Sequence, residues 1–199
     1  MAISGSLVVI AFAGQRQLRS RAQFDAAVDK MVGSVADAHN QATAGVNVKG
    51  PGNGSVNCAG AASSGKYIFA GTAWSGIDSA VGATFQIDYY AAYRGTAPPA
   101  ATACIYDTQY VSLAPGVRVN ASSPATARIG RTLFVRDDLG GINVCQVTST
   151  TTVVATSFRA GACTAGAVGN TAQTITLTDP DGHTSRVQVD PSGLAKRLD

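Results

Sequence analysis

The spacing of apolar residues near the start of the chain predicts one long helix. The apolar positions fall alternately four and three residues apart, which keeps them on one narrow face of a helix. They are Phe24, Val28, Met31, Val35, Ala38 and Ala42. No proline precedes Pro51, and Gly45 follows the last apolar position, as expected of a helix-ending glycine. We therefore predict a helix that ends near Gly45, and its part from Gln15 to Ala44 would be about 45 Å long.

The segment before this helix, residues 1–14, is apolar between Leu7 and Ala13 and has three interpretations. It is shorter than the roughly 20 residues that a transmembrane helix needs. As a secretory signal, it has small residues for cleavage at 11–13 but lacks a basic leading region. As the rear half of a longer apolar helix, truncated at its front, it continues directly into the helix that follows. The last interpretation is favoured, and it divides the chain into an apolar segment (1–14), an amphipathic helix (15–45) and a globular head (46–199).

The remainder of the chain alternates apolar and polar residues with a period of two, which is typical of strands. We predict strands at 66–70, 83–89 and 109–113, and a hairpin of 131–136 with 142–147 around the turn at 137–141, which 151–158 would continue. Further strands are predicted at 174–178 and 186–189, with a short last strand after the turn at 190–193. The expected fold is α+β, with a long N-terminal α-helix packed on an antiparallel β-sheet head.

The composition points to an unusual surface. Only 14% of the residues are charged, against roughly 25% in typical soluble domains. All twelve acidic residues are Asp, and the chain contains no Glu. A surface of small neutral residues suits an extracellular or a closely packed assembly. The net charge of +3 is too small to indicate nucleic-acid binding by itself.

Four cysteines, Cys58, Cys104, Cys145 and Cys163, are spread through the β-rich region without a Cys-x-x-Cys pair. This spacing disfavours a zinc site and favours two disulfides formed in an oxidising compartment. Three pairings are possible. We prefer Cys145 with Cys163 and Cys58 with Cys104; four buried free thiols are the alternative.

No arrangement of residues indicates catalysis. His183 follows Asp179 and Asp181, but the chain has no Gly-x-Ser-x-Gly motif, and a hairpin turn explains these residues better than a catalytic triad does. The pairs Asp179/Asp181 and Asp137/Asp138 could bind calcium weakly, the former being the better candidate, yet both occur where Asp favours turns. We predict no enzyme, no cofactor and no metal.

The main charge cluster is a basic collar of Arg16, Arg19 and Arg21, which could lie at a membrane interface, pair with Asp residues of a neighbouring helix, or be solvated. Three tyrosines stand near Arg94, but strand alternation places Tyr89 and Tyr93 on one face and Tyr90 on the other, so packing explains them. His39 is expected at the helix surface. The triplets at Asn53 and Asn120 match the glycosylation pattern, which is common by chance.

This layout resembles the type IV pilin and pseudopilin family. Residues 7–28 are similar to the part of the pilin N-terminal helix where the apolar half passes into the amphipathic half, and residues 185–196 are similar to the last hairpin of minor pseudopilins. The family's cleavage glycine and the Glu at the fifth mature position have no counterpart here. We expect that the N-terminal helix is truncated.

The resemblance implies a structural subunit of an extracellular filament, held in the inner membrane before assembly and associated with identical subunits and other pilins. Under this hypothesis the residues that carry assembly are Leu7, Val8, Val9, Ile10 and Phe12, whereas Phe24, Val28, Met31 and Val35 dock the helix onto the head. The rival hypothesis is a secreted or membrane-tethered β-sandwich binding module whose first thirteen residues are a signal or anchor.

Overall fold

The computed structural model describes residues 2–45, 67–77, 82–93, 103–123, 129–147, 151–164, 167–168 and 171–198. Side chains are described from Gln15 onward, apart from those of 67, 93, 120–123, 129–130, 151–153 and 167–168 within these ranges.

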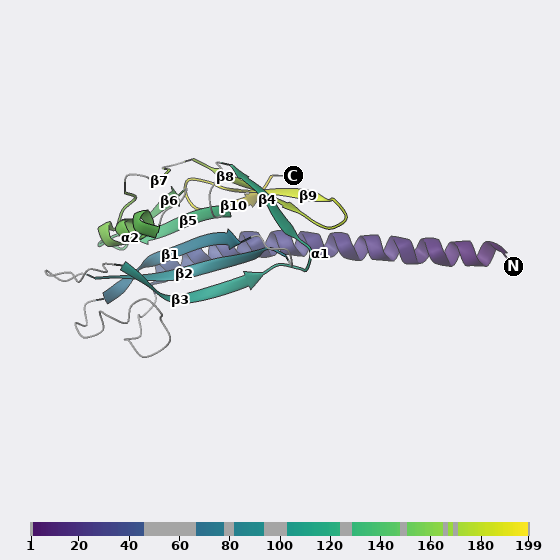
Figure 1. Ribbon diagram of the computed structural model, residues 1–199, viewed down its shortest axis with the longest axis horizontal. Coiled ribbons are helices and arrows are strands. Elements are labelled where there is room, and N and C mark those ends of the chain that lie inside the picture. The colour runs from purple at the N-terminus through teal and green to yellow at the C-terminus, as the bar shows by residue number, and fades with distance from the viewer. Residues whose placement is uncertain are drawn as a thin grey trace.

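One long helix, α1 (Ala2–Ala44), runs along the head and continues past its strands on the N-terminal side (Figure 1). It crosses the predicted boundary at residues 14–15 without a break. It ends as the sequence predicts, because Gly45 adopts the left-handed conformation (φ 71°) and its N–H donates to the Gln41 carbonyl at 3.1 Å.

The larger sheet has six antiparallel strands in the order β3-β2-β1-β5-β6-β7. They are β1 (Tyr67–Ile77), β2 (Thr84–Tyr93), β3 (Ala103–Ser112), β5 (Ile129–Arg136), β6 (Ile142–Val147) and β7 (Ala167–Val168). The predicted hairpin of β5 and β6 is present, with Arg136 paired to Ile142 across the turn.

A second, four-stranded antiparallel sheet has the order β10-β9-β8-β4. Its strands are β4 (Arg118–Ser123), β8 (Gln173–Thr178), β9 (Thr184–Val189) and β10 (Ala195–Arg197). Alternate residues of β8 and β9 point inward, including Ile175, Leu177, Val187 and Val189, which are fully buried.

The core has two parts, one on each face of the larger sheet. The first lies between α1 and both sheets and joins the apolar stripe of α1 to Trp74, Phe85 and Phe134 of the larger sheet and to Ile175 of the smaller one. The second lies on the opposite face, under the helix α2 (Thr151–Ala160). There Phe158 stacks on Tyr90 with ring centroids 4.2 Å apart.

Two predictions of secondary structure are wrong. The expected α+β, pilin-like arrangement of one helix on one antiparallel sheet is replaced by two sheets that share α1, because β4 pairs with β8 instead of extending the first sheet beside β3. The segment 151–158, expected as a strand, forms α2. Its β-branched composition favours a strand, but Val154 and Phe158 lie four residues apart, and both bury against the sheet when the segment is helical.

Candidate functional site

The candidate site is α1 itself, which has a buried part and an exposed part. The four predicted docking residues, Phe24, Val28, Met31 and Val35, are at most 2% exposed and lie in the core that α1 shares with both sheets. At about 25 cal/mol per Å² of apolar surface removed from water, such burial is the main force that holds this part of the helix.

Two buried hydrogen bonds fix the register of α1 on strand β1. Ser34 Oγ donates to the Met31 carbonyl at 2.7 Å and accepts from Trp74 Nε1 at 2.9 Å. Thr72 Oγ1 donates to the Ala38 carbonyl at 2.7 Å. Sequence reasoning missed both contacts, although Ser34 carried a signal: it is a polar residue three positions after Met31, next to the apolar stripe.

The side chains of Arg136 and Tyr89 bind the C-terminal end of α1. Arg136 Nη1 donates to the Thr43 carbonyl at 2.8 Å and to the Ala42 carbonyl at 3.4 Å, where the helix dipole is negative. The Tyr89 hydroxyl contacts the side-chain oxygen of Gln41. Burial raises the pKa of Tyr89, the bond to Gln41 lowers it, and nearby carboxylates raise it again; the net rise keeps the phenol protonated.

Closer to the N-terminus, three polar contacts mark where the head stops supporting the helix. Lys30 Nζ donates to the Ser112 carbonyl at 2.7 Å, and Asp25 forms an ion pair with Arg197 at 2.9 Å. The last contact is between the Ser20 hydroxyl, which donates, and the Asp181 carboxylate.

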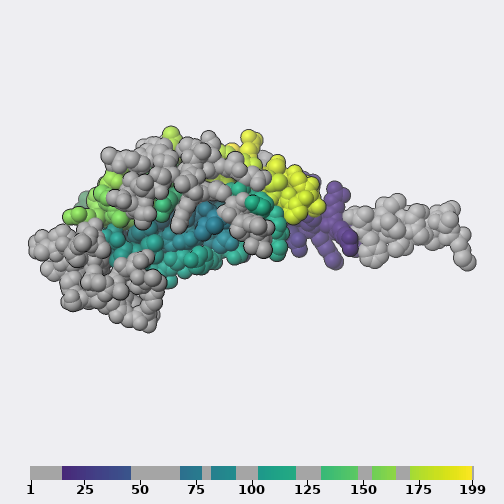
Figure 2. Space-filling model, viewed as in Figure 1, coloured from purple at the N-terminus to yellow at the C-terminus, as the bar shows by residue number. Residues whose placement is uncertain are grey.

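Beyond this point the helix is exposed. From Gln15 to Gln23 every residue is exposed except Ser20, which is half-buried, and Leu18 is 71% exposed. In Figure 2 this part of α1 protrudes from the head beside the C-terminal strands. The predicted assembly residues Leu7, Val8, Val9, Ile10 and Phe12 lie on the helical backbone of α1, but their side chains are outside the described residues.

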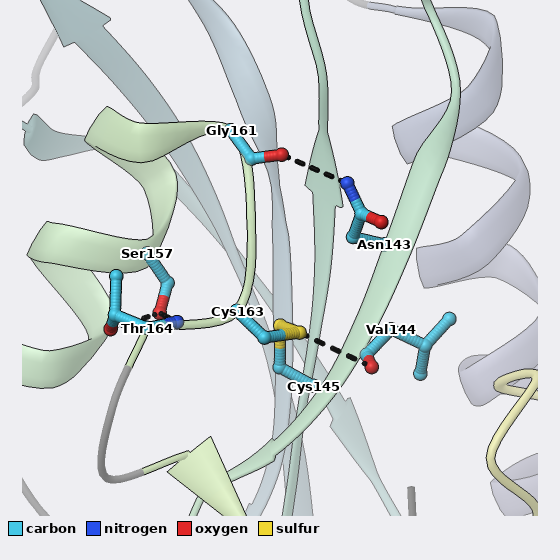
Figure 3. The surroundings of a disulfide bond; sticks show 7 residues. All are labelled: Asn143, Val144, Cys145, Ser157, Gly161, Cys163 and Thr164. Atoms are coloured by element: carbon cyan, nitrogen blue, oxygen red, sulfur yellow. Dashed lines mark hydrogen bonds between the residues drawn. A yellow bond between two sulfur atoms is a disulfide. The ribbon is translucent and has the colours of Figure 1, made fainter. Parts of the chain in front are cut away.

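A disulfide lies in the head beside α2 and joins the segment after this helix to β6. Cys145 and Cys163 are bonded as predicted, and the two cysteines, 18 positions apart, enclose a segment that contains α2 (Figure 3). Asn143 Nδ2 also donates to the Gly161 carbonyl at 2.9 Å, which ties the end of α2 to β6. Cys104 is disulfide-bonded as well, and its predicted partner Cys58 lies outside the described residues.

The candidate calcium pair lies in the turn between β8 and β9, where Asp179, Asp181 and His183 bring their ligand atoms within 4.8 Å of one another. The Asp179 carboxylate already accepts bonds from the N–H groups of Asp181 and His183 and, at 2.8 Å, contacts the His183 ring. These bonds are the ordinary ones of an Asp-initiated turn. Turn formation therefore accounts for the positions of Asp179 and of the backbone N–H groups that it binds.

The other predicted residues have structural positions. Asp137 closes the β5–β6 turn by accepting from the N–H groups of Leu139 and Gly141. His39 lies edge-on to Phe134 at 5.4 Å, so it is half-buried rather than at the surface. The remaining side chains that were singled out, those of Asn53, Tyr93, Arg94 and Asn120, are outside the described residues.

Within the described part of the chain, no helix is both long enough and apolar enough to span a membrane. No family model, curated protein or solved structure matches this chain.

Proposed function

We propose that this chain is a structural subunit of an extracellular filament of the type IV pilus kind, assembling through the N-terminal part of α1 and displaying the β-rich head. The observation that carries the proposal is the exposed part of α1, Gln15–Gln23, which extends the helix beyond the head and has Leu18 open to solvent. The sequence pattern of residues 7–28, similar to that of pilins, supports the same assignment.

The physical argument starts from the instability of exposed helices. A helix without tertiary contacts is marginal in water, because its stability comes mostly from packing an apolar face. The head supplies that packing from Phe24 onward, but no described residue supplies it between Gln15 and Leu18. Since residues 7–13 are apolar in sequence, burial in lipid before assembly and against identical helices afterwards would stabilise this end.

Helices that bury one another with an axial shift form contacts that do not close on themselves, so a filament grows. The heads would then form the outer layer, where their disulfides suit an oxidising exterior. The low content of charged residues, 14%, would allow the heads to lie close together.

The test is a charge placed in the apolar segment. Val9→Asp or Ile10→Asp should abolish filaments, because an isolated carboxylate is costly to bury. Leu139→Asp is the matched control: it adds the same charge at an apolar position of the head that is 98% exposed, and it should leave filaments intact. Filaments are measured by negative-stain electron microscopy of material sheared from producing cells, with antibody against the head.

The head should remain folded in all three variants, since its core begins at Phe24; thermal unfolding and retention of the Cys145–Cys163 disulfide check this. Filaments at the wild-type level in the Val9→Asp variant would overturn the proposal. So would wild-type protein found only as a soluble monomer whose native N-terminus is Gly14, a result that would favour the secreted binding module.

A further inference from the structure

Two buried polar side chains, Arg131 of β5 and Ser75 of β1, lie on the same face of the larger sheet. The two strands are neighbours, and their register shifts just after the pair Trp74–Thr132, so that Ser75 stands opposite residues 130 and 131 (Figure 1). Trp74 contacts α1, and Thr132 contacts the smaller sheet. Because side chains alternate along a strand, Ser75 and Arg131 point to the other face, against which α2 packs.

Both side chains carry polar atoms without a hydrogen-bond partner. Arg131 is 7% exposed and Ser75 is 1% exposed. Arg131 Nε and Ser75 Oγ are enclosed, and no group in the described part of the chain comes within hydrogen-bonding distance of either atom. Buried polar groups in folded proteins are nearly always paired, by protein, water or an ion. Two such atoms on adjacent strands of one face therefore indicate a common partner.

Arg131 also lacks a counter-charge. No ion pair joins its guanidinium to any residue that the structure describes. Asp88, paired with Ala73 of β1, places a carboxylate on the same face, but this group accepts hydrogen bonds from Gln86 Nε2 at 2.5 Å and Thr108 Oγ1 at 2.8 Å. A buried cation without a nearby anion is costly. A water molecule would pair the N–H group and leave that charge uncompensated.

We propose that Arg131 and Ser75 bind a small oxyanion, a phosphate group or a carboxylate, on this face of the larger sheet. The planar guanidinium donates two N–H groups side by side to such a ligand, and the Ser75 hydroxyl donates to another of its oxygens. The negative charge of the ligand balances that of Arg131. A metal cation does not fit, because the guanidinium would repel it. The small exposed fraction of Arg131 limits the bound group to a few atoms.

The test is the binding of inorganic phosphate, sulfate and acetate to the purified full chain. Each salt is compared with sodium chloride at equal ionic strength and kept below about 20 mM, because sulfate and phosphate at high concentration stabilise most proteins by exclusion. A ligand that binds only the folded protein raises its melting temperature. We expect a saturable rise with at least one of the three anions. Calorimetric titration gives each Kd, and the tightest of the three shows whether the ligand is a phosphate-like group or a carboxylate.

Two variants of the full chain test the assigned residues. Arg131→Met removes the charge and the donors but keeps an unbranched side chain in the buried position, and it should weaken anion binding by at least about tenfold. Ser75→Ala removes one hydroxyl and should weaken binding by about threefold to tenfold. Arg186→Met is the matched control, because Arg186 is exposed on β9 of the other sheet, and it should leave the Kd within about twofold of wild type.

The fold of Arg131→Met should not need the anion, because the substitution takes an uncompensated charge out of the interior. Without added anion this variant should melt at or above the wild-type temperature, and the anion should not raise that temperature further. No saturable binding of any of the three anions to the wild type, or the same Kd for the wild type and Arg131→Met, would overturn the site. If Arg131→Met does not fold, an unchanged Kd in Ser75→Ala would overturn it. The proposed function is tested separately by filament formation in Val9→Asp, so either inference can fail without the other.

Discussion

The two parts of α1 differ in what covers them. From Phe24 to Ala42 one face of the helix is buried against both sheets, and polar contacts hold it at Ser34, Ala38 and Arg136. From Gln15 to Gln23 the side chains are exposed apart from that of Ser20, which is half-buried and donates a hydrogen bond to Asp181 of the head. The four–three apolar stripe is present only in the buried part. The stripe therefore marks the helix surface that the head of the same chain covers, and the exposed Leu18 is not part of that surface.

Truncating one large apolar side chain in each part would test this difference most strongly. Met31→Ala, at a position that is fully buried, should reduce the free energy of unfolding by about 2–5 kcal/mol, since it leaves a cavity beneath the helix. Leu18→Ala removes a side chain that is 71% exposed and should change it by less than about 0.5 kcal/mol. Urea unfolding followed by tryptophan fluorescence of Trp74 measures both.

Equal destabilisation by the two substitutions would mean that the head also packs against Leu18. The distinction between a buried and an exposed part of α1 would then be wrong. If the comparison holds, Leu18→Ala should show its effect in the yield of filaments instead.

The next largest expected change in unfolding free energy comes from removing the buried hydrogen bond between Ser34 and Trp74. Ser34→Ala leaves the Trp74 Nε1–H without an acceptor inside the core, which should cost about 1–3 kcal/mol of unfolding free energy. The matched control is Thr43→Ala, because the Thr43 hydroxyl also donates to a carbonyl of its own helix, at 3.0 Å, but is exposed. Urea denaturation gives both values, and a Ser34→Ala effect no larger than the control would show that water replaces the lost acceptor.

Local signals explain which features could be predicted from the sequence. The stripe of α1, the glycine at Gly45 and the Asp-initiated turn at Asp137 each depend on residues close in sequence, and the structure contains all three. The pairing of β4 with β8 joins residues about sixty positions apart, as in Arg118 with Thr178, and alternation within a strand carries no information about its partner.

Helix α2 and the anchors of α1 escaped prediction for a related reason. Helix α2 forms because a sheet face is available to Phe158, and Arg136 reaches the end of α1 only after the whole head has folded. The candidate site was therefore predictable as a helix with a buried apolar stripe. The position along α1 at which the helix is no longer packed against the head was not predictable.

The turn at Asp179, which is one of three similar turns, lies beside the position at which α1 becomes exposed. Asp137, Asp179 and Asp190 each accept two backbone N–H bonds, and each turn has a glycine of positive φ three residues later. Of the three, the Asp179 turn has a described hydrogen bond with α1, from the Ser20 hydroxyl to the Asp181 carboxylate. This bond connects the Asp179 turn to the otherwise exposed part of α1.

The smallest predicted effect is the pH dependence of this turn. Burial raises the pKa of Asp179, but the ring and backbone of His183 and the N–H of Asp181 outweigh it, so the pKa lies below the reference value of 3.8. Because the folded pKa is the lower one, Asp179 stabilises the fold fully above about pH 4 and loses this contribution as pH falls through the folded pKa. The difference in unfolding free energy between wild type and Asp179→Asn should thus be constant from pH 6 to about pH 4 and shrink towards pH 2. Urea titrations across this range measure it, with Asp29→Asn as the control for losing an exposed carboxylate. A difference that stays constant down to pH 2 would mean that the Asp179 charge contributes nothing to the stability of the fold.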